Sequence, residues 1–362
     1  MRSLRKILGF LFAVVLVVGV FSNIPAVEND VNADTDIAIN EENFPDENFR
    51  KYVSKYEDKD HDGFLSKSEL KTVAMYIQRS SISDLKGIEY FTNLKVLFCS
   101  ENQLTSLDVS KNTNLEQLAC DKNQLTDLDL SKNTKLTYLS CGRNQLTSLD
   151  VSKNTSLIKL DCGVTKLSSL DVSKNIALES LYCISCYLTC LDVSKNTALK
   201  SLNVYNNQLI SLDVSKNTSL VYLRCGCNKL ISLDVSKNTA LKELECFSNQ
   251  LTSLNVSNLT TIEKIDCLYN ELTCLDVSGN TALLYLYCSN NKLTSLDVSK
   301  NSALKTLDCD TNQLTKLDVR KNYSLERLSC YNNNLTRIDI SKNTSLKSAV
   351  CYGNPLVFFY CR

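Results

Sequence analysis

Hydrophobic and polar positions follow a fixed 21-residue cycle from about residue 80 to the end of the chain. One place in each cycle is cysteine, at 99, 120, 141, 162, 183, 225, 246, 267, 288, 309, 330 and 351, and only Val204 interrupts the series. Leucine stands five residues after this place, and asparagine three residues after it except at Thr165 and Cys186. A fixed period of this length predicts a repeat architecture and not a disulfide framework.

Each cycle reads LxxLxCxxNxL followed by LxxLDVSKN. In LxC and in LDV the first and third residues share one face, as a strand requires, so we expect two short parallel strands per coil. About thirteen coils would stack roughly 4.8 Å apart and bury continuous columns of leucine, valine and cysteine. The asparagines are expected to point inward and satisfy backbone groups, which makes Thr165 and Cys186 local weak points.

The spacing LxxLxLxxN in both halves resembles the leucine-rich repeat family, most closely its bacterial internalin-like subclass with a 21-residue repeat of two alternating halves. The resemblance covers about three quarters of the chain. It implies a β-rich leucine-rich-repeat solenoid that acts in adhesion or interaction.

The segment before the repeats carries the sequence DKDHDGFLSKSE over 58–69, which meets the EF-hand calcium-loop pattern. Apolar spacing predicts helices over 45–56 and 66–78 around it. The expected Ca²⁺ ligands are Asp58, Asp60, Asp62, Phe64 through its carbonyl, Ser66 and Glu69. A lone EF-hand would pack on the first coils as a structural cap, because repeat arrays need terminal caps. The alternative is an acidic turn that binds nothing.

The first residues resemble a secretory signal peptide, with a basic start and an apolar run from Ile7 to Phe21. Cleavage after Ala26 or after Ala33 is compatible with the sequence, and an uncleaved membrane anchor is the alternative. We therefore expect an exported protein, either secreted or surface-associated. The predicted organisation is a signal peptide over 1–26, a linker over 27–40, an EF-hand cap over 41–80, a solenoid over 81–351 and a C-terminal cap over 352–362.

The composition of the chain excludes several classes of function. The 40 basic and 40 acidic residues cancel, which gives no electrostatic basis for nucleic-acid binding. His61 is the only histidine and lies inside the calcium loop, so histidine-dependent catalysis is excluded and we predict no enzyme. Most of the 17 cysteines are expected to pack as small apolar residues. Two alternatives are a metal site at Cys183, Cys186 and Cys190, and a disulfide between Cys351 and Cys361.

The two strand faces differ in composition. On the LDV side the outward positions repeat as serine and aspartate. A row of lysines three residues further along is expected to offset the repulsion between stacked aspartates. The alternative is that the aspartate row binds cations weakly. On the LxC side the outward positions are rich in aromatics: Phe98, Tyr138, Tyr182, Tyr205, Tyr222, Phe247, Tyr285, Tyr287 and Tyr331, with Tyr352 beyond. Aromatic residues are frequent in binding hot spots, although they also simply suit exposed strands.

These observations predict a calcium-binding interaction or adhesion module that takes a protein or glycan ligand on its aromatic face. The alternative is a structural or self-assembling extracellular rod without a specific ligand.

Overall fold

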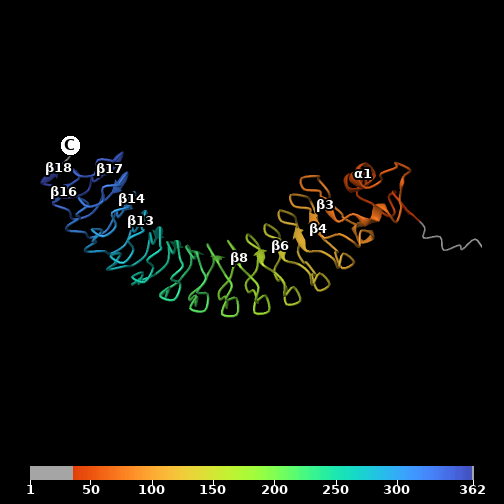
Figure 1. The fold of residues 1–362 in the computed structure, drawn as a ribbon, viewed down its shortest axis with the longest axis horizontal. Coiled ribbons are helices and arrows are strands. Elements are labelled where there is room, and N and C mark those ends of the chain that lie inside the picture. The colour runs from red at the N-terminus through yellow and green to blue at the C-terminus, as the bar shows by residue number, and fades with distance from the viewer. Residues whose placement is uncertain (1–35, 361–362) are drawn as a thin grey trace, which may run out of the picture. The chain divides into compact units, whose positions relative to one another are not determined.

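The computed structural model describes residues 36–360 (Figure 1). The predicted signal peptide and most of the predicted linker lie outside these residues, as does Cys361. Within residues 36–360, one α-helix, α1 (Glu47–Tyr56), and two 3₁₀ turns (Glu69–Lys71 and Ile88–Tyr90) accompany eighteen short strands. The strands are β1 (Ile37–Ala38), β2 (Phe64–Leu65), β3 (Ala74–Tyr76), β4 (Val96–Phe98), β5 (Gln117–Ala119), β6 (Tyr138–Ser140), β7 (Lys159–Asp161), β8 (Ser180–Tyr182), β9 (Ser201–Asn203), β10 (Tyr222–Arg224), β11 (Glu243–Glu245), β12 (Lys264–Asp266), β13 (Tyr285–Tyr287), β14 (Thr306–Asp308), β15 (Arg327–Ser329), β16 (Arg337–Asp339), β17 (Ser348–Val350) and β18 (Phe358–Tyr360).

The predicted solenoid is confirmed. Strands β3 to β15 and β17 form one 14-stranded sheet in which each strand pairs in parallel with the strand of the next coil. Figure 1 shows them following one another in chain order, with α1 at the end of the array where β3 lies. The register advances by one 21-residue cycle per strand, for example Tyr222 opposite Glu243, so equivalent positions of successive coils form straight rows.

The prediction of two strands per coil is wrong for most coils. The LxC side supplies the sheet, whereas in the described part of the chain the LDV side forms a strand pair only between β16 and β18. In the other coils an aspartate carboxylate, or the amide oxygen of Asn255 in one coil, accepts the backbone N–H two residues on, as Asp108 does from Ser110 at 2.8 Å. This local turn satisfies a donor that a second sheet would otherwise use.

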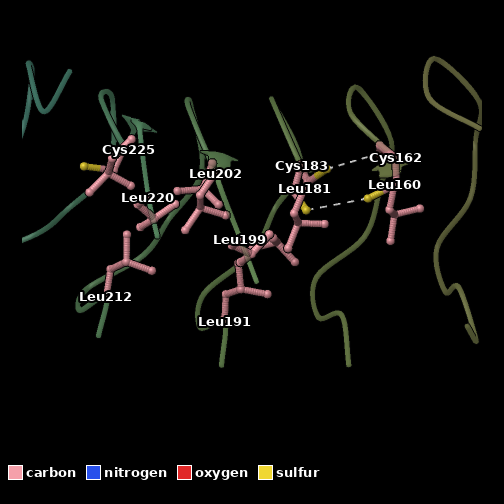
Figure 2. Packing of buried hydrophobic residues seen from close by; sticks show 14 of the residues in the cluster. Leu160, Cys162, Leu181, Cys183, Leu191, Leu199, Leu202, Leu212, Leu220 and Cys225 are labelled. Atoms are coloured by element: carbon pink, nitrogen blue, oxygen red, sulfur yellow. Dashed lines mark hydrogen bonds between the residues drawn. The ribbon is translucent and has the colours of Figure 1, made fainter. Parts of the chain in front are cut away.

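Leucine, valine and cysteine side chains fill the interior between the two sides of each coil. Ladder cysteines such as Cys162, Cys183 and Cys225 have no exposed surface, which confirms that they pack as small apolar residues. Figure 2 shows Cys162 and Cys183 on neighbouring coils with the adjacent leucines, and their Sγ atoms are 3.7 Å apart.

Two rows of asparagine hold successive coils together. In the first row, three residues after the ladder position, Asn228 accepts the N–H of Leu209 at 3.0 Å and donates through Nδ2 to backbone carbonyls. In the second row, Asn217 donates to two carbonyls, but its Oδ1 has no partner. Thr165 and Cys186 interrupt the first row, and neither accepts a backbone N–H from the preceding coil, in line with the predicted weak points.

The predicted first helix is confirmed as α1, which begins after Asp46, whose carboxylate caps the N–H of Phe49 at 2.9 Å. The predicted second helix over 66–78 is wrong. The chain makes only the 3₁₀ turn Glu69–Lys71 and then enters β3. Met75 and Ile77 are fully buried at alternate positions, so the two-residue period of the first sheet strand overrides the helical spacing of this segment.

The helical segment makes direct contacts with the first coil. Asp46 also accepts the backbone N–H and hydroxyl of Ser83, both at 2.8 Å, and Asn48 donates to the carbonyl of Ser81. Phe44 packs against Gly87, which has φ +102° and where a Cβ would lie 2.3 Å from the Phe44 ring. The fit therefore depends on a glycine.

No helix within residues 36–360 is long and apolar enough to cross a membrane.

Candidate functional site

The fold of the loop 58–69 brings three carboxylate groups close together. One oxygen from each of Asp58, Asp60 and Glu69 lies within 4.8 Å of the others, and this is the only such group of three histidine, cysteine or acidic residues in the described part of the chain. Asp58 is 2% exposed, and its Oδ1 has no hydrogen-bond partner. A buried carboxylate oxygen left without a donor is suited to a cation.

The rest of the loop is organised by hydrogen bonds to these carboxylates. Asp58 accepts the N–H of Gly63 at 3.1 Å, and Glu69 accepts the N–H of Lys59 and both donors of Ser66. Burial raises the pKa of Glu69, but the Ser66 and backbone hydrogen bonds outweigh it and hold the pKa below its usual value. Glu69 therefore stays ionised and lies across the loop from Asp58.

The remaining predicted ligands have other positions. Asp62 is exposed and accepts the N–H of Phe64 at 2.8 Å, outside the group of three. Phe64 lies in β2, and Ser66 donates to Glu69. The structure thus joins three of the expected ligands, while Asp62, Phe64 and Ser66 shape the loop around them.

A short strand closes the loop from outside. Strand β1 pairs antiparallel with β2, placing Ile37 opposite Leu65, and the N–H of Ile39 donates to the carbonyl of Gly63 at 2.9 Å. Sequence reasoning missed β1, because a two-residue strand has no detectable period. The chain supplies this strand from residues that precede α1.

Six of the nine predicted aromatic residues lie at the first or third position of a sheet strand, on either side of a buried middle residue, and Tyr205, Phe247 and Tyr331 lie two residues after a strand. Tyr138 and Tyr182 face each other across Lys159, whose Nζ lies 5.3 Å and 5.6 Å from the two ring centroids. Tyr205 and Phe247 are 5.6 Å apart. Most of these rings are half-buried by their neighbours, and Tyr222 is exposed. The sheet therefore presents a packed and ordered aromatic surface.

Sequence reasoning overlooked the acids in the same outward rows. Asp266 and Asp308 flank the row position of Tyr287, and Asp310 follows directly after the ladder cysteine. Burial, together with the neighbouring acids Glu245 and Asp308, raises the pKa of Asp266 to about 6. Burial and a hydrogen bond with Asp308 raise the pKa of Asp310 to about 7. The sequence did contain a signal for these aspartates, because they occupy the positions next to the ladder cysteines at which other coils have tyrosines.

The aspartate row on the LDV side has a structural role. Hydrogen bonds from the serine two residues on lower the pKa of Asp108, Asp129 and Asp150. The expected lysines add a weaker attraction, and no ion pair joins these three aspartates to them. The serine donors, more than the lysine row, therefore offset the repulsion.

The three cysteines of the 183–190 motif do not bring their sulfur atoms together into a ligand group among the described residues. Cys183 lies in the ladder, Cys186 lies in the asparagine row, and Cys190 is exposed. Burial raises the pKa of the ladder thiols Cys99 and Cys225 to about 12. Protonated thiols are poor metal ligands, which supports the packing role.

A parallel sheet of 21-residue coils, with ladders of asparagine and cysteine, defines a leucine-rich repeat protein. A family model described as Leucine Rich repeats (2 copies) matches residues 92–132. The chain is similar to the solved functional domain of InlJ from Listeria monocytogenes, whose title reports a cysteine ladder, with 37% identity and a TM-score of 0.77. The match covers 88% of this chain and 77% of that one. The chain thus belongs to the internalin-like leucine-rich repeat proteins, which are non-enzymatic.

Other comparisons are more distant or shorter. The Leptospira interrogans leucine-rich repeat protein LIC12759 is 26% identical, covering 79% of this chain and 77% of that one with a TM-score of 0.70. An internalin (inlF) from Listeria monocytogenes strain 4b F2365 shares the fold at 24% identity and a TM-score of 0.79, covering 88% of this chain and 98% of that one. Internalin J from serotype 4b (strain F2365) is 37% identical over 70 residues, which are 19% of this chain and 8% of that protein.

Proposed function

We propose that this chain is an exported adhesion or interaction module that binds a protein ligand on the outward face of its sheet. The observation that carries the proposal is the aromatic surface, with Tyr205 packed on Phe247 and Tyr138 and Tyr182 held about Lys159. Preordered aromatic side chains lose little conformational entropy on binding. Export rests on the signal-like leader, and a glycan ligand is the alternative outcome of the test.

Replacing Tyr205, Tyr287 and Tyr331 by serine is expected to reduce adhesion at least fivefold. Beads coated with residues 36–360 would be applied to surfaces carrying matrix proteins, serum proteins or mucin glycans, and retention measured under flow. The matched control replaces Tyr187, Tyr269 and Tyr323, which are 55%, 57% and 59% exposed but lie outside the sheet face. Equal loss in both variants, or no retention above albumin-coated beads, contradicts the proposal.

We further propose that the loop 58–69 binds one Ca²⁺ as a structural ion of the cap. The support is the unpartnered Oδ1 of Asp58 together with the approach of Asp60 and Glu69. When bound, calcium would neutralise the three carboxylates and link α1 to the segment that enters β3. An extracellular EF-hand loop needs an affinity of only about 0.1–1 mM for this role.

Calcium at 10 mM is expected to stabilise the protein by about 1.4–2.7 kcal/mol if the affinity lies in that range. Calorimetric titration of residues 36–360 should show one site, with thermal unfolding followed in parallel. Asp58→Asn with Glu69→Gln should remove both signals, whereas Asp127→Asn with Glu271→Gln should retain them. Several weak sites that survive the loop substitutions would instead assign cation binding to the aspartate row.

A further inference from the structure

The LDV side of the coils changes its charge in two neighbouring coils near the end of the described chain. The outward position directly before the LDV segment is uncharged or acidic in every coil from Ser106 to Ser295, and it is then Lys316 and Arg337. Two residues after the LDV aspartate, the serine that recurs from Ser110 to Ser299 is replaced by Arg320. Because equivalent positions of successive coils form rows, these three cations lie close together.

A pocket of about 270 Å³ lies among these cations. Its polar lining consists of Lys316, Arg320, Arg337, Asp318, Asp339 and Tyr360. The strand pair β16 and β18 fixes one wall, since Asp339 lies opposite Tyr360 in register and the N–H of Ile340 donates to the carbonyl of Tyr360 at 3.0 Å. Tyr360 is 54% exposed, so its ring is available to a ligand. The pocket thus combines three cations with an aromatic side chain on a paired strand.

Both acids of the pocket already have hydrogen-bond donors. Asp318 accepts Nε and Nη2 of Arg320 at 2.9 and 2.7 Å, and these bonds lower the pKa of Asp318 to about 2. Asp339 accepts the N–H and the hydroxyl of Ser341 at 3.0 and 2.6 Å. The bidentate pair leaves Nη1 of Arg320 without a hydrogen-bond acceptor among the described residues.

The other two cations of the pocket have no counter-charge of their own. Among residues 36–360, Lys316 and Arg337 form neither an ion pair nor a hydrogen bond through their charged groups. They occupy one row in adjacent coils, so their charges repel each other. The lysine row beside them adds Lys300, Lys321 and Lys342. The lining, with three cations and two carboxylates, therefore keeps a net positive charge that an anion would neutralise.

The donors and the ring together suit an oxyanion that is carried on a larger group. Guanidinium and ammonium groups bind phosphate and sulfate oxygens through charge-assisted hydrogen bonds. We propose that this pocket binds a phosphorylated or sulfated sugar, with the oxyanion held by Lys316, Arg337 and Nη1 of Arg320 and the sugar packed against Tyr360. The site lies on the LDV side, apart from the aromatic sheet face and from the loop 58–69, so it does not depend on the proposed function.

The test follows the phosphorus NMR line width of glucose 6-phosphate as the purified protein is added at pH 7.5. The line should broaden, and it should sharpen again when inorganic phosphate or glucose 6-sulfate competes, whereas glucose should have no effect. Lys316→Gln with Arg337→Gln should weaken binding roughly fivefold or more, because two charge-assisted contacts are lost. Tyr360→Ser should weaken the binding of glucose 6-phosphate more than that of inorganic phosphate.

The matched control is Lys195→Gln with Lys216→Gln, which removes equal charge from exposed positions on the same side of central coils. It should change the affinity less than about twofold, since exposed charges several coils away are screened. All four substituted side chains are exposed, so circular dichroism should show both double variants folded.

Three outcomes overturn the inference. Equal weakening by the two double substitutions would mean that the general charge of the LDV side attracts the anion. Equal loss of glucose 6-phosphate and inorganic phosphate in Tyr360→Ser would contradict a sugar in the pocket. No broadening with the unsubstituted protein would mean that the pocket binds no phosphate ester. If the pocket is occupied as proposed, the relative strength of the two esters as competitors identifies whether phosphate or sulfate is preferred.

Discussion

Replacing Phe49 by alanine is expected to destabilise the protein by about 3–5 kcal/mol, because a fully buried aromatic ring in a tight core is lost. Phe49 has no exposed surface and packs edge-on against Phe44, with ring centroids 5.8 Å apart. Phe44 in turn contacts Tyr90 of the first coil at 5.8 Å. The substitution therefore loosens the cap from the solenoid, and the loss should be seen in urea unfolding followed by circular dichroism.

A control on the same helix separates packing from helix propensity. Tyr56 is 48% exposed, so Tyr56→Ala should change stability by no more than about 0.5 kcal/mol. Hydrogen exchange should show that Phe49→Ala exposes the first coils more than the central ones, since each coil is stabilised by its neighbours. Similar unfolding midpoints for Phe49→Ala and the unsubstituted protein would show that the helical segment is not a cap.

Asn228→Leu is expected to cost about 2–3 kcal/mol, because it leaves the buried N–H of Leu209 without its acceptor. Asn217→Leu, in the second row, should cost about 1 kcal/mol or less. The Oδ1 of Asn217 already has no partner, and the carbonyls of Val193 and Asn196 keep backbone donors when the side chain is removed. Chemical unfolding of the two variants provides the comparison.

Each of the two asparagine rows already contains a position at which this chain has another residue. Leu259 occupies the second-row position in one coil and is fully buried there. Cys186 occupies the first-row position, and Cys186→Asn should stabilise by about 1 kcal/mol because it restores an acceptor for the preceding coil. Equal costs for Asn228→Leu and Asn217→Leu would mean that the two asparagine rows are energetically equivalent, contrary to their hydrogen bonding.

The loop 58–69 shows which parts of a candidate site a sequence motif can specify. The order of Asp58, Asp60 and Glu69 predicted that their oxygens would meet, and they do. The same motif predicted a second helix, which the structure replaces with a 3₁₀ turn and β3. The apolar spacing of this segment is compatible with a helix and also with a strand. It becomes a strand because the segment around Met75 and Ile77 pairs with β4, which lies one full coil further along the chain.

The sequence by itself determined the repeat length, the buried ladders of cysteine and leucine, and the row of outward aromatics, because each depends only on a residue's place within one 21-residue cycle. The tertiary structure alone decided three other features. Strand β1 closes the loop, the LDV side forms turns held by aspartate, and Asp310 becomes buried beside Asp308. These three features depend on contacts between coils or between segments far apart in the sequence. There a competing hydrogen-bond donor or a neighbouring charge decides the local structure, and the pattern within one 21-residue cycle does not contain these contacts.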